Sequence, residues 1–137
     1  MRNCQILDVN RKQVVGRRSI LNDGPRIKKI VPSEESSLLE AEYPPECVLD
    51  LKGKLVMPGL IDCHTHLCVV QASGEVETVL ENLGASEGLK VLCAARHARE
   101  TLEAGFTTVR DMGLGDNLAF KEAIERGIIP GPRIVAC

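Results

Sequence analysis

Aromatic side chains are nearly absent from this 137-residue sequence, which contains no tryptophan, one tyrosine and two phenylalanines. A hydrophobic core must therefore be built from aliphatic side chains, and stacking platforms that bind single-stranded nucleic acid through aromatic rings are disfavoured. An excess of basic residues is also missing, because 17 Lys and Arg stand against 19 Asp and Glu, a net charge of −2. The sequence thus predicts neither a nucleic-acid partner nor an anionic membrane partner.

Long hydrophobic runs are missing as well. No stretch approaches the roughly 20 apolar residues of a membrane span, and the first residues, MRNCQILDVNRK, lack the apolar segment of a secretory signal. We therefore expect a cytoplasmic protein that makes no contact with a membrane. The six cysteines are expected to be reduced thiols. None of them is spaced as C-x-x-C, so a zinc site made of cysteines is not expected.

The first 57 residues have the pattern of short strands separated by turns. Residues 22–25, Asn-Asp-Gly-Pro, are a turn signal, and the polar segment 33–45, which ends in two prolines, is a predicted loop. Lys52-Gly53 is predicted to be a hairpin turn. Strands are expected where residues with high β-propensity cluster, at residues 4–7, 19–21, 26–30, 48–51 and 54–57.

From residue 58 the pattern changes to alternating strands and helices. The apolar start Gly59–Asp62 predicts a strand that is buried on both faces. Strand, helix, strand, helix, strand is typical of a parallel α/β sheet. Such a sheet would have one unpaired edge and one uncovered face, so we expect this chain to be part of a longer protein. After the first strand, the pattern predicts a helix at 86–104, a strand at 106–111, a helix from Asp116 or Asn117 to Arg126, and a strand at 133–136.

Two of the three histidines, His64 and His66, lie two positions apart at the end of the first of these strands. Side chains at i and i+2 of a strand point to the same face, so the two imidazoles can converge on one metal ion. Asp62 shares their parity and is expected to orient an imidazole or a neighbouring backbone group. The alternative is a pair of polar histidines satisfied by water and by the backbone.

Residues 56–66, which read VMPGLIDCHTH, contain the pattern P-G, two apolar residues, then D-x-H-x-H. This run resembles the signature at the first barrel strand of the amidohydrolase superfamily. Residues 50–54 resemble the lead-in to that strand, and residues 103–111 resemble the second βα unit of the family. Within the superfamily, 103–111 and the segment Gly131-Pro132-Arg133 are most similar to imidazolonepropionase-like and prolidase-like members.

The resemblance implies an α/β fold in which residues 58–137 form the first βαβαβ units of a (β/α)₈ TIM-type barrel. Residues 1–57 would be part of a small β-sandwich. It implies that His64 and His66 bind a divalent metal, most often zinc, at a site of one or two ions. The implied activity is hydrolysis of a C–N bond in a small molecule, such as an amide, dipeptide or cyclic amide. The family's remaining ligands and its proton shuttle lie on later strands, so no catalytic residue is assigned within these 137 residues and the chain alone is expected to be inactive.

Two other readings of the same family are a deaminase and a barrel that has lost catalysis and serves a structural role. A homo-oligomer of the longer protein is compatible with each of these readings. A third reading comes from a different class, because residues 113–118 follow a strand and begin G-x-G-x-x, as a dinucleotide-binding turn does. Leu118 stands where that turn needs Gly or Ala, which disfavours nucleotide binding.

Several polar residues near the strand ends are further candidates. Arg110 is a candidate for binding a substrate carboxylate, with a structural ion pair as the alternative, and only one of Arg110 and Asp111 can face the barrel interior. His97 is expected on a solvated helix face. Cys63 and Thr65 are expected to pack against helices, because their parity is opposite to that of the histidines.

Overall fold

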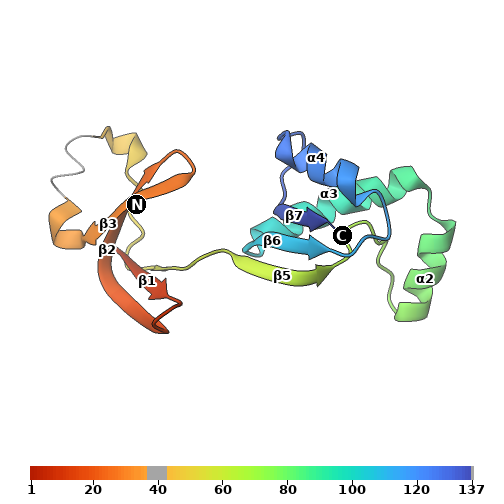
Figure 1. The fold of residues 1–137 in the computed structure, drawn as a ribbon, viewed down its shortest axis with the longest axis horizontal. Coiled ribbons are helices and arrows are strands. Elements are labelled where there is room, and N and C mark those ends of the chain that lie inside the picture. The colour runs from red at the N-terminus through yellow and green to blue at the C-terminus, as the bar shows by residue number, and fades with distance from the viewer. Residues whose placement is uncertain (37–42, 137) are drawn as a thin grey trace. The chain divides into compact units, whose positions relative to one another are not determined.

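The computed structural model describes residues 1–36 and 43–136, and the chain divides into two units, Met1–Pro58 and Gly59–Cys137 (Figure 1). Part of the predicted loop 33–45 falls on residues 37–42, which lie outside the described residues. Among the helices in the described ranges, none is both long enough and apolar enough to cross a membrane.

The first unit is a four-stranded sheet in the order β3-β2-β1-β4. Neighbouring strands β1, β2 and β3 pair antiparallel, whereas β4 joins β1 in parallel. The predicted strands 4–7, 19–21 and 26–30 are confirmed and are longer than the sequence indicated. The bounds are β1 (Cys4–Asp8), β2 (Gln13–Asp23), β3 (Arg26–Pro32) and β4 (Leu55–Val56), with short 3-10 helices η1 (Ser33–Glu35) and η2 (Pro45–Cys47).

The predicted turn at residues 22–25 is confirmed as a two-residue connection between β2 and β3. Asp23 pairs with Arg26, so Gly24 and Pro25 alone make the turn. Gly24 has a φ of 53°, a left-handed conformation that glycine adopts without the steric cost of a side chain.

The strand predicted at residues 48–51 is wrong. Only Asp50 makes a bridge there, an isolated parallel one with Arg2. The Asp50 carboxylate instead accepts a hydrogen bond from the Lys52 N–H at 2.9 Å and one from Arg2 at 3.1 Å, so it favours a turn over a continued ladder. Lys52-Gly53 is a turn, but it does not make a hairpin, because β4 runs parallel to β1.

The second unit is a parallel sheet in the order β5-β6-β7, which confirms the predicted alternation of strands and helices. Ser86 caps one helix through the Leu89 N–H, and Asp116 caps another through the Ala119 N–H. The first helix start was predicted from the spacing of apolar residues, and the second from a cap at Asp116 or Asn117. The elements are β5 (Leu60–Thr65), α2 (Glu75–Gly84), α3 (Glu87–Glu103), β6 (Phe106–Asp111), α4 (Asn117–Glu125) and β7 (Arg133–Ala136).

The core of the second unit lies between the sheet and the helices α3 and α4, which contact β6 and β7 respectively (Figure 1). Ala94 and Ala98 of α3 have no exposed surface, and their small side chains let the helix lie close to Val109 in the central strand. The other members of this buried cluster are Leu67, Cys68, Phe120 and Ile134.

The expectation that β5 is buried on both faces is wrong. Ile61 is 66% exposed and Leu60 is 40% exposed. The physical reason is that β5 is an edge strand of the described sheet. On β7, Ile134 is buried, but the adjacent Val135 is 48% exposed, so the described helices cover one face of the sheet only.

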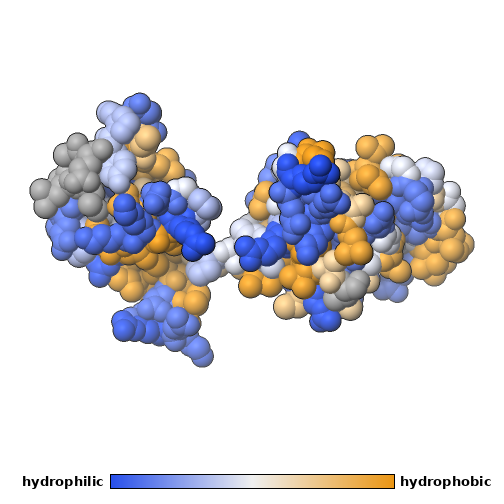
Figure 2. Space-filling model, turned by 45° about the horizontal axis from the view of Figure 1, so that its top comes forward, coloured by the Kyte–Doolittle hydropathy of each residue, from blue (hydrophilic) through white to orange (hydrophobic). Residues whose placement is uncertain are grey.

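Helix α2 was not predicted, although its pattern is visible in the sequence. Val76, Val79, Leu80 and Leu83 recur at helical spacing, and all four are exposed in the structure. Figure 2 shows apolar surface at the end of the second unit that carries α2 and the start of α3. Ala85 and Ser86 separate α2 from α3. The spacing of apolar residues does not reveal this break between the two helices.

We expect Asp50→Ala to destabilise the first unit at neutral pH and to lose this effect in acid. The hydrogen bond from the Lys52 N–H, then that from Asn3, holds the pKa of Asp50 below its usual 3.8. A lowered pKa in the folded state contributes stability above pH 3.8 that is lost as pH falls through the lower folded value. Thermal unfolding followed on the amide signals of β1 and β2 from pH 7 to pH 2 measures this.

Glu46→Ala is the matched control, because it removes one exposed negative charge from the same unit. A loss of stability in Asp50→Ala that stays the same at every pH would contradict the assigned role of the carboxylate.

Candidate functional site

The end of β5 brings two histidine side chains together. The Nε2 atoms of His64 and His66 lie 3.2 Å apart, and the rings meet edge to face with an angle of 72° between their planes. His64 is exposed and lies within the strand, whereas His66 is half-buried and lies just beyond it. The two side chains therefore present one nitrogen each to the same point in space.

The orientation of His66 is set by a backbone carbonyl from another part of the chain. Its Nδ1 lies 3.2 Å from the oxygen of Gly113, in the loop that follows β6. A carbonyl can only accept, so Nδ1 carries the proton and Nε2 carries the lone pair. The lone pair of His66 is thus directed to the side where His64 lies.

This arrangement fits a divalent metal ion. Two imidazole nitrogens at about 2.0–2.1 Å from one tetrahedral ion are about 3.3 Å apart, close to the 3.2 Å found here. Metal-binding histidines usually donate their other ring N–H to a carbonyl or carboxylate, as His66 does to Gly113. Within residues 1–36 and 43–136, no group of three or more His, Cys, Asp or Glu side chains is placed to hold a metal, and His64 and His66 are the candidate ligands.

Asp62 contacts the backbone of His64 and not an imidazole. Its Oδ1 accepts a hydrogen bond from the His64 N–H at 3.0 Å. The sequence led us to expect that Asp62 orients an imidazole or a neighbouring backbone group, and the contact found is with the backbone. The ladder between β5 and β6 shifts here, because Asp62 lies opposite Val109 but Thr65 lies opposite Asp111. Three steps along β5 match two along β6, so the pairing is irregular between Asp62 and Thr65.

Arg110 and Asp111 differ in exposure, as is expected of neighbouring residues on a strand. Arg110 is exposed, and its carbonyl accepts a hydrogen bond from the Thr65 hydroxyl at 3.4 Å. Asp111 is completely buried. Its Oδ1 accepts from the Gly113 N–H at 2.9 Å, and its Oδ2 accepts from the Leu67 N–H at 3.4 Å. The sequence singled out Asp111 only as a neighbour of Arg110, so its two backbone contacts were missed.

His97 was expected on a solvated helix face, and this expectation is wrong. The side chain is half-buried, and its Nδ1 lies 2.9 Å from the carbonyl of Leu67, the residue after His66. A cavity of about 280 Å³ beside the strand end is lined by His66 and His97 together with Gln71 and Glu100. The apolar positions on either side of His97 gave a signal, since Ala94 and Ala98 place this side of α3 against the sheet.

The cysteines near the pair differ in environment. Cys63 is exposed, which overturns the expectation that it packs against a helix, because it lies at the irregular part of the edge strand. Cys68 is buried in the core. Burial, followed by the nearby carboxylate of Asp111, raises the pKa of the Cys68 thiol to about 11. This thiol therefore stays protonated at neutral pH.

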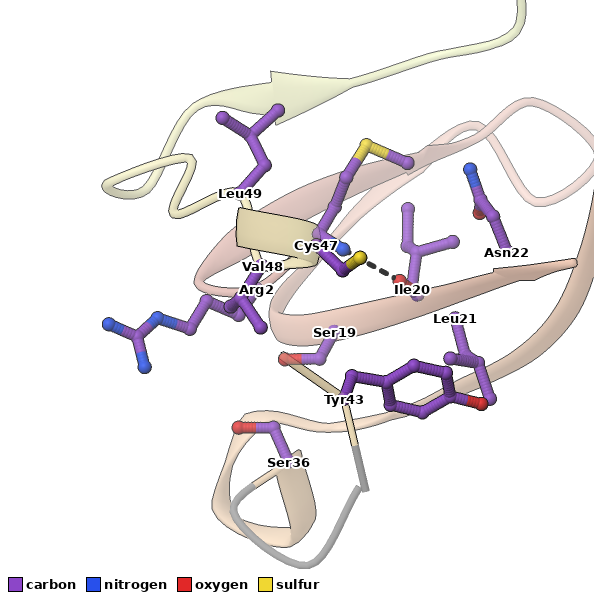
Figure 3. Close-up of a pocket in the computed structure, with 11 residues that line it drawn as sticks. Arg2, Ser19, Ile20, Leu21, Asn22, Ser36, Tyr43, Cys47, Val48 and Leu49 are labelled. Atoms are coloured by element: carbon purple, nitrogen blue, oxygen red, sulfur yellow. Dashed lines mark hydrogen bonds between the residues drawn. The ribbon is translucent and has the colours of Figure 1, made fainter. Parts of the chain in front are cut away.

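The first unit contains a cavity of about 330 Å³ that offers no comparable chemistry (Figure 3). Its described lining is mostly apolar and includes Ile20, Leu21 and Val48, with no histidine or carboxylate. A terminal ammonium group at Met1 donates to the carbonyl of Ile20 at 2.9 Å. The histidine pair of the second unit is therefore the stronger candidate for a functional site.

Comparison with known proteins gives the family. A sequence profile described as the Amidohydrolase family matches residues 55–137, which is more than half of the chain. The chain belongs to the amidohydrolase family. An imidazolonepropionase from Pseudomonas fluorescens (strain Pf0-1) is 34% identical over 132 residues, which cover 80% of this chain and 32% of that protein.

Solved structures of other amidohydrolases share the fold of this chain. A crystal structure of an amidohydrolase superposes with a TM-score of 0.77 at 30% identity and covers 98% of this chain and 30% of its own. A prolidase in complex with N-methylphosphonate-L-proline has a TM-score of 0.70 at 25% identity, covering 98% of this chain and 30% of its own. The chain thus spans about a third of the length of the relatives it matches.

In this amidohydrolase chain, Gly59 is the residue that lets β5 approach β6. A Cβ atom at this position would collide with the side chain of Thr107. We expect Gly59→Ala to destabilise the second unit by about 1–3 kcal/mol, the usual cost of overpacking. Chemical denaturation followed by the amide signals of β5 and β6 measures the loss.

Gly84→Ala is the matched control in the same unit, because nothing lies within 4 Å of a Cβ built at this last residue of α2. It should leave stability unchanged or raise it by up to about 1 kcal/mol. Equal midpoints for Gly59→Ala and the unmodified chain would contradict the close approach.

Proposed function

We propose that this chain supplies the first two ligands, His64 and His66, of a metal-dependent amidohydrolase that cleaves a C–N bond in a small molecule. The observation that carries the proposal is the 3.2 Å separation of the two Nε2 atoms. It is supported by the bond from His66 Nδ1 to Gly113, which leaves the His66 lone pair on the side of His64. Zinc is the proposed ion, because two imidazoles in a tetrahedral arrangement suit it well.

The proposed architecture is a (β/α)₈ barrel with a small β-sandwich. Residues 58–137 would form the first strands and helices of the barrel, and residues 1–57 part of the sandwich. The parallel order β5-β6-β7, with helices on one face and exposed Ile61 and Val135 elsewhere on the sheet, supports a sheet that continues and closes. His64 and His66 lie at the C-terminal end of β5, where active sites of such barrels are found.

In the proposed reaction, His64 and His66 would hold a divalent ion, whose chemistry would be to lower the pKa of a water molecule and to polarise the scissile carbonyl. The residues of this chain hold the ligands in place. Gly113 fixes the ring of His66 through its carbonyl, and Asp62 holds the backbone of His64. Arg110 is the proposed partner for a substrate carboxylate, since a guanidinium can donate two parallel hydrogen bonds to it.

The proposed substrates are small molecules with a hydrolysable C–N bond, namely a dipeptide, an N-acyl amino acid or a cyclic amide. The similarity to imidazolonepropionases supports a cyclic amide. The similarity to a prolidase and to a Xaa-Pro dipeptidase supports a dipeptide.

We expect the 137-residue chain to bind one zinc or cobalt ion and to lose this binding in His64→Ala and in His66→Ala, because each variant removes one of two ligands. Isothermal titration with Zn²⁺ and the absorption spectrum with Co²⁺ measure the affinity and the number of ions. Cys63→Ser is the control, because this exposed thiol lies beside His64 on the same strand and should not contribute. Unchanged binding in both histidine variants would show that the pair is only a hydrogen-bonded one.

We also expect the zinc-loaded 137-residue chain to hydrolyse neither Xaa-Pro dipeptides nor imidazolone propionate. The carboxylates of Asp62 and Asp111, which contact the backbone beside the pair, are engaged with backbone N–H groups, so neither is assigned to pass a proton to a leaving nitrogen. Product formation followed by chromatography tests this. Turnover that requires His64 would contradict the view that further residues complete the site.

A further inference from the structure

A single buried carboxylate joins the ends of two neighbouring strands. Asp111, the last residue of β6, has no exposed surface. Its Oδ1 accepts a hydrogen bond from the Gly113 N–H at 2.9 Å, and its Oδ2 accepts a longer one of 3.4 Å from the Leu67 N–H. One donor belongs to the loop after β6 and the other to the loop after β5.

Both donors belong to residues that adjoin His66, one along the chain and one through a contact with its ring. Leu67 is the next residue along the chain, so its peptide group sets the backbone of His66. Gly113 carries the carbonyl that accepts from His66 Nδ1 at 3.2 Å. The carboxylate therefore reaches the backbone of His66 through one oxygen and the hydrogen-bond partner of its ring through the other.

Further bonds fix the same peptide groups. The carbonyl of Leu67 accepts from His97 Nδ1 at 2.9 Å, so Leu67 is held at both its N–H and its carbonyl. The Met112 N–H donates to the carbonyl of Thr65 at 2.9 Å, one residue before His66. Gly113 has a φ of 91°, a conformation in which most side chains would be strained, and its turned backbone lets the carbonyl reach His66.

The charge of Asp111 suits the binding of two backbone N–H groups. Burial of a carboxylate is costly unless its oxygens are hydrogen-bonded, and here each oxygen has a backbone donor. A carboxylate accepts at both oxygens, and such charge-assisted bonds are stronger than neutral ones. An amide offers one accepting oxygen and an NH₂ group, so it would place a donor against one of the two backbone N–H groups.

We propose that Asp111 is a positioning residue for His66, whose imidazole it holds in one tautomer and one orientation by binding the backbone at Leu67 and at Gly113. This rests on the proposed role of His66 as a metal ligand. Asp111 touches neither the ion nor a substrate, and it acts through the carbonyl of Gly113 and the peptide of Leu67.

The first test reads the ring of His66 in the metal-free chain. Long-range ¹H–¹⁵N spectra of the histidine side chains should show His66 of the unmodified chain as a single tautomer with its proton on Nδ1. In Asp111→Asn we expect a mixture that includes the form with the proton on Nε2. The same single tautomer in Asp111→Asn would overturn the proposal, whether or not the chain binds a metal.

The second test measures affinity for Zn²⁺ alone by titration. We expect Asp111→Asn to bind about 10–100-fold more weakly than the unmodified chain, the usual effect of removing a group that orients a ligand. Equal affinities would overturn the positioning role. Failure of the unmodified chain to bind Zn²⁺ would instead overturn the proposed ligand role of His66, while the tautomer test would still decide whether Asp111 orients its ring.

Two controls separate positioning from a general loss of stability. Asp116→Asn makes the same change five residues further along, at a helix cap where Asn serves as well as Asp, and should alter neither readout. Val109→Ala removes buried volume from the same strand without touching either donor. A loss of the single His66 tautomer in Val109→Ala as large as in Asp111→Asn would overturn the proposal.

A measurement on the unmodified chain covers the case in which Asp111→Asn does not fold. The amide protons of Leu67 and Gly113 should exchange slowly with solvent deuterium, because both are bound to the buried carboxylate. Rapid exchange at either amide would overturn the proposal.

Discussion

The parallel pairing of β5 with β6 is the constraint on which the candidate site depends. At one end the Leu60 N–H donates to the carbonyl of Gly105, and at the other Thr65 lies opposite Asp111. This register makes the two strands end together, so the residues that follow them share one edge of the sheet. Burial of Val109 beneath α3 keeps the register in place. Without it, His66 would not meet the carbonyl of Gly113, which is 47 residues away in the chain.

Features fixed by nearby residues could be predicted from the sequence, and features fixed by a distant strand could not. The start of α3 depends on Ser86, whose side chain accepts a hydrogen bond from the Leu89 N–H only three residues away. The turn at Gly24 depends on its own backbone conformation. The irregular pairing between Asp62 and Thr65, in contrast, involves the partner strand β6, so it cannot be predicted from the residues of β5 alone. A distant partner also acts at 48–51, where Asp50 binds Arg2, 48 residues away in the chain, and no strand forms.

The same distinction between local and distant causes applies to the candidate site. Alternation along a strand was enough to predict that His64 and His66 come together. It could not reveal which nitrogen of His66 faces His64, because that choice is made by the loop after β6. Nor could it place His97, which follows from the packing of Ala94 and Ala98 against the sheet. The pairing of the two imidazoles could therefore be predicted locally, whereas the tautomer and orientation of His66 arise from tertiary contacts.

Asp111 affects the neighbouring Cys68 thiol as well as the orientation of His66. Cys68 lies two residues after His66, and a thiolate is a stronger ligand for zinc than an imidazole once the thiol has lost its proton. Burial and the charge of Asp111 raise the pKa of that thiol to about 11. At neutral pH the thiol therefore stays protonated inside the core, whereas the two imidazole nitrogens, one exposed and one half-buried, remain accessible. The buried carboxylate that binds the loops around His66 thus also favours the neutral form of the neighbouring thiol.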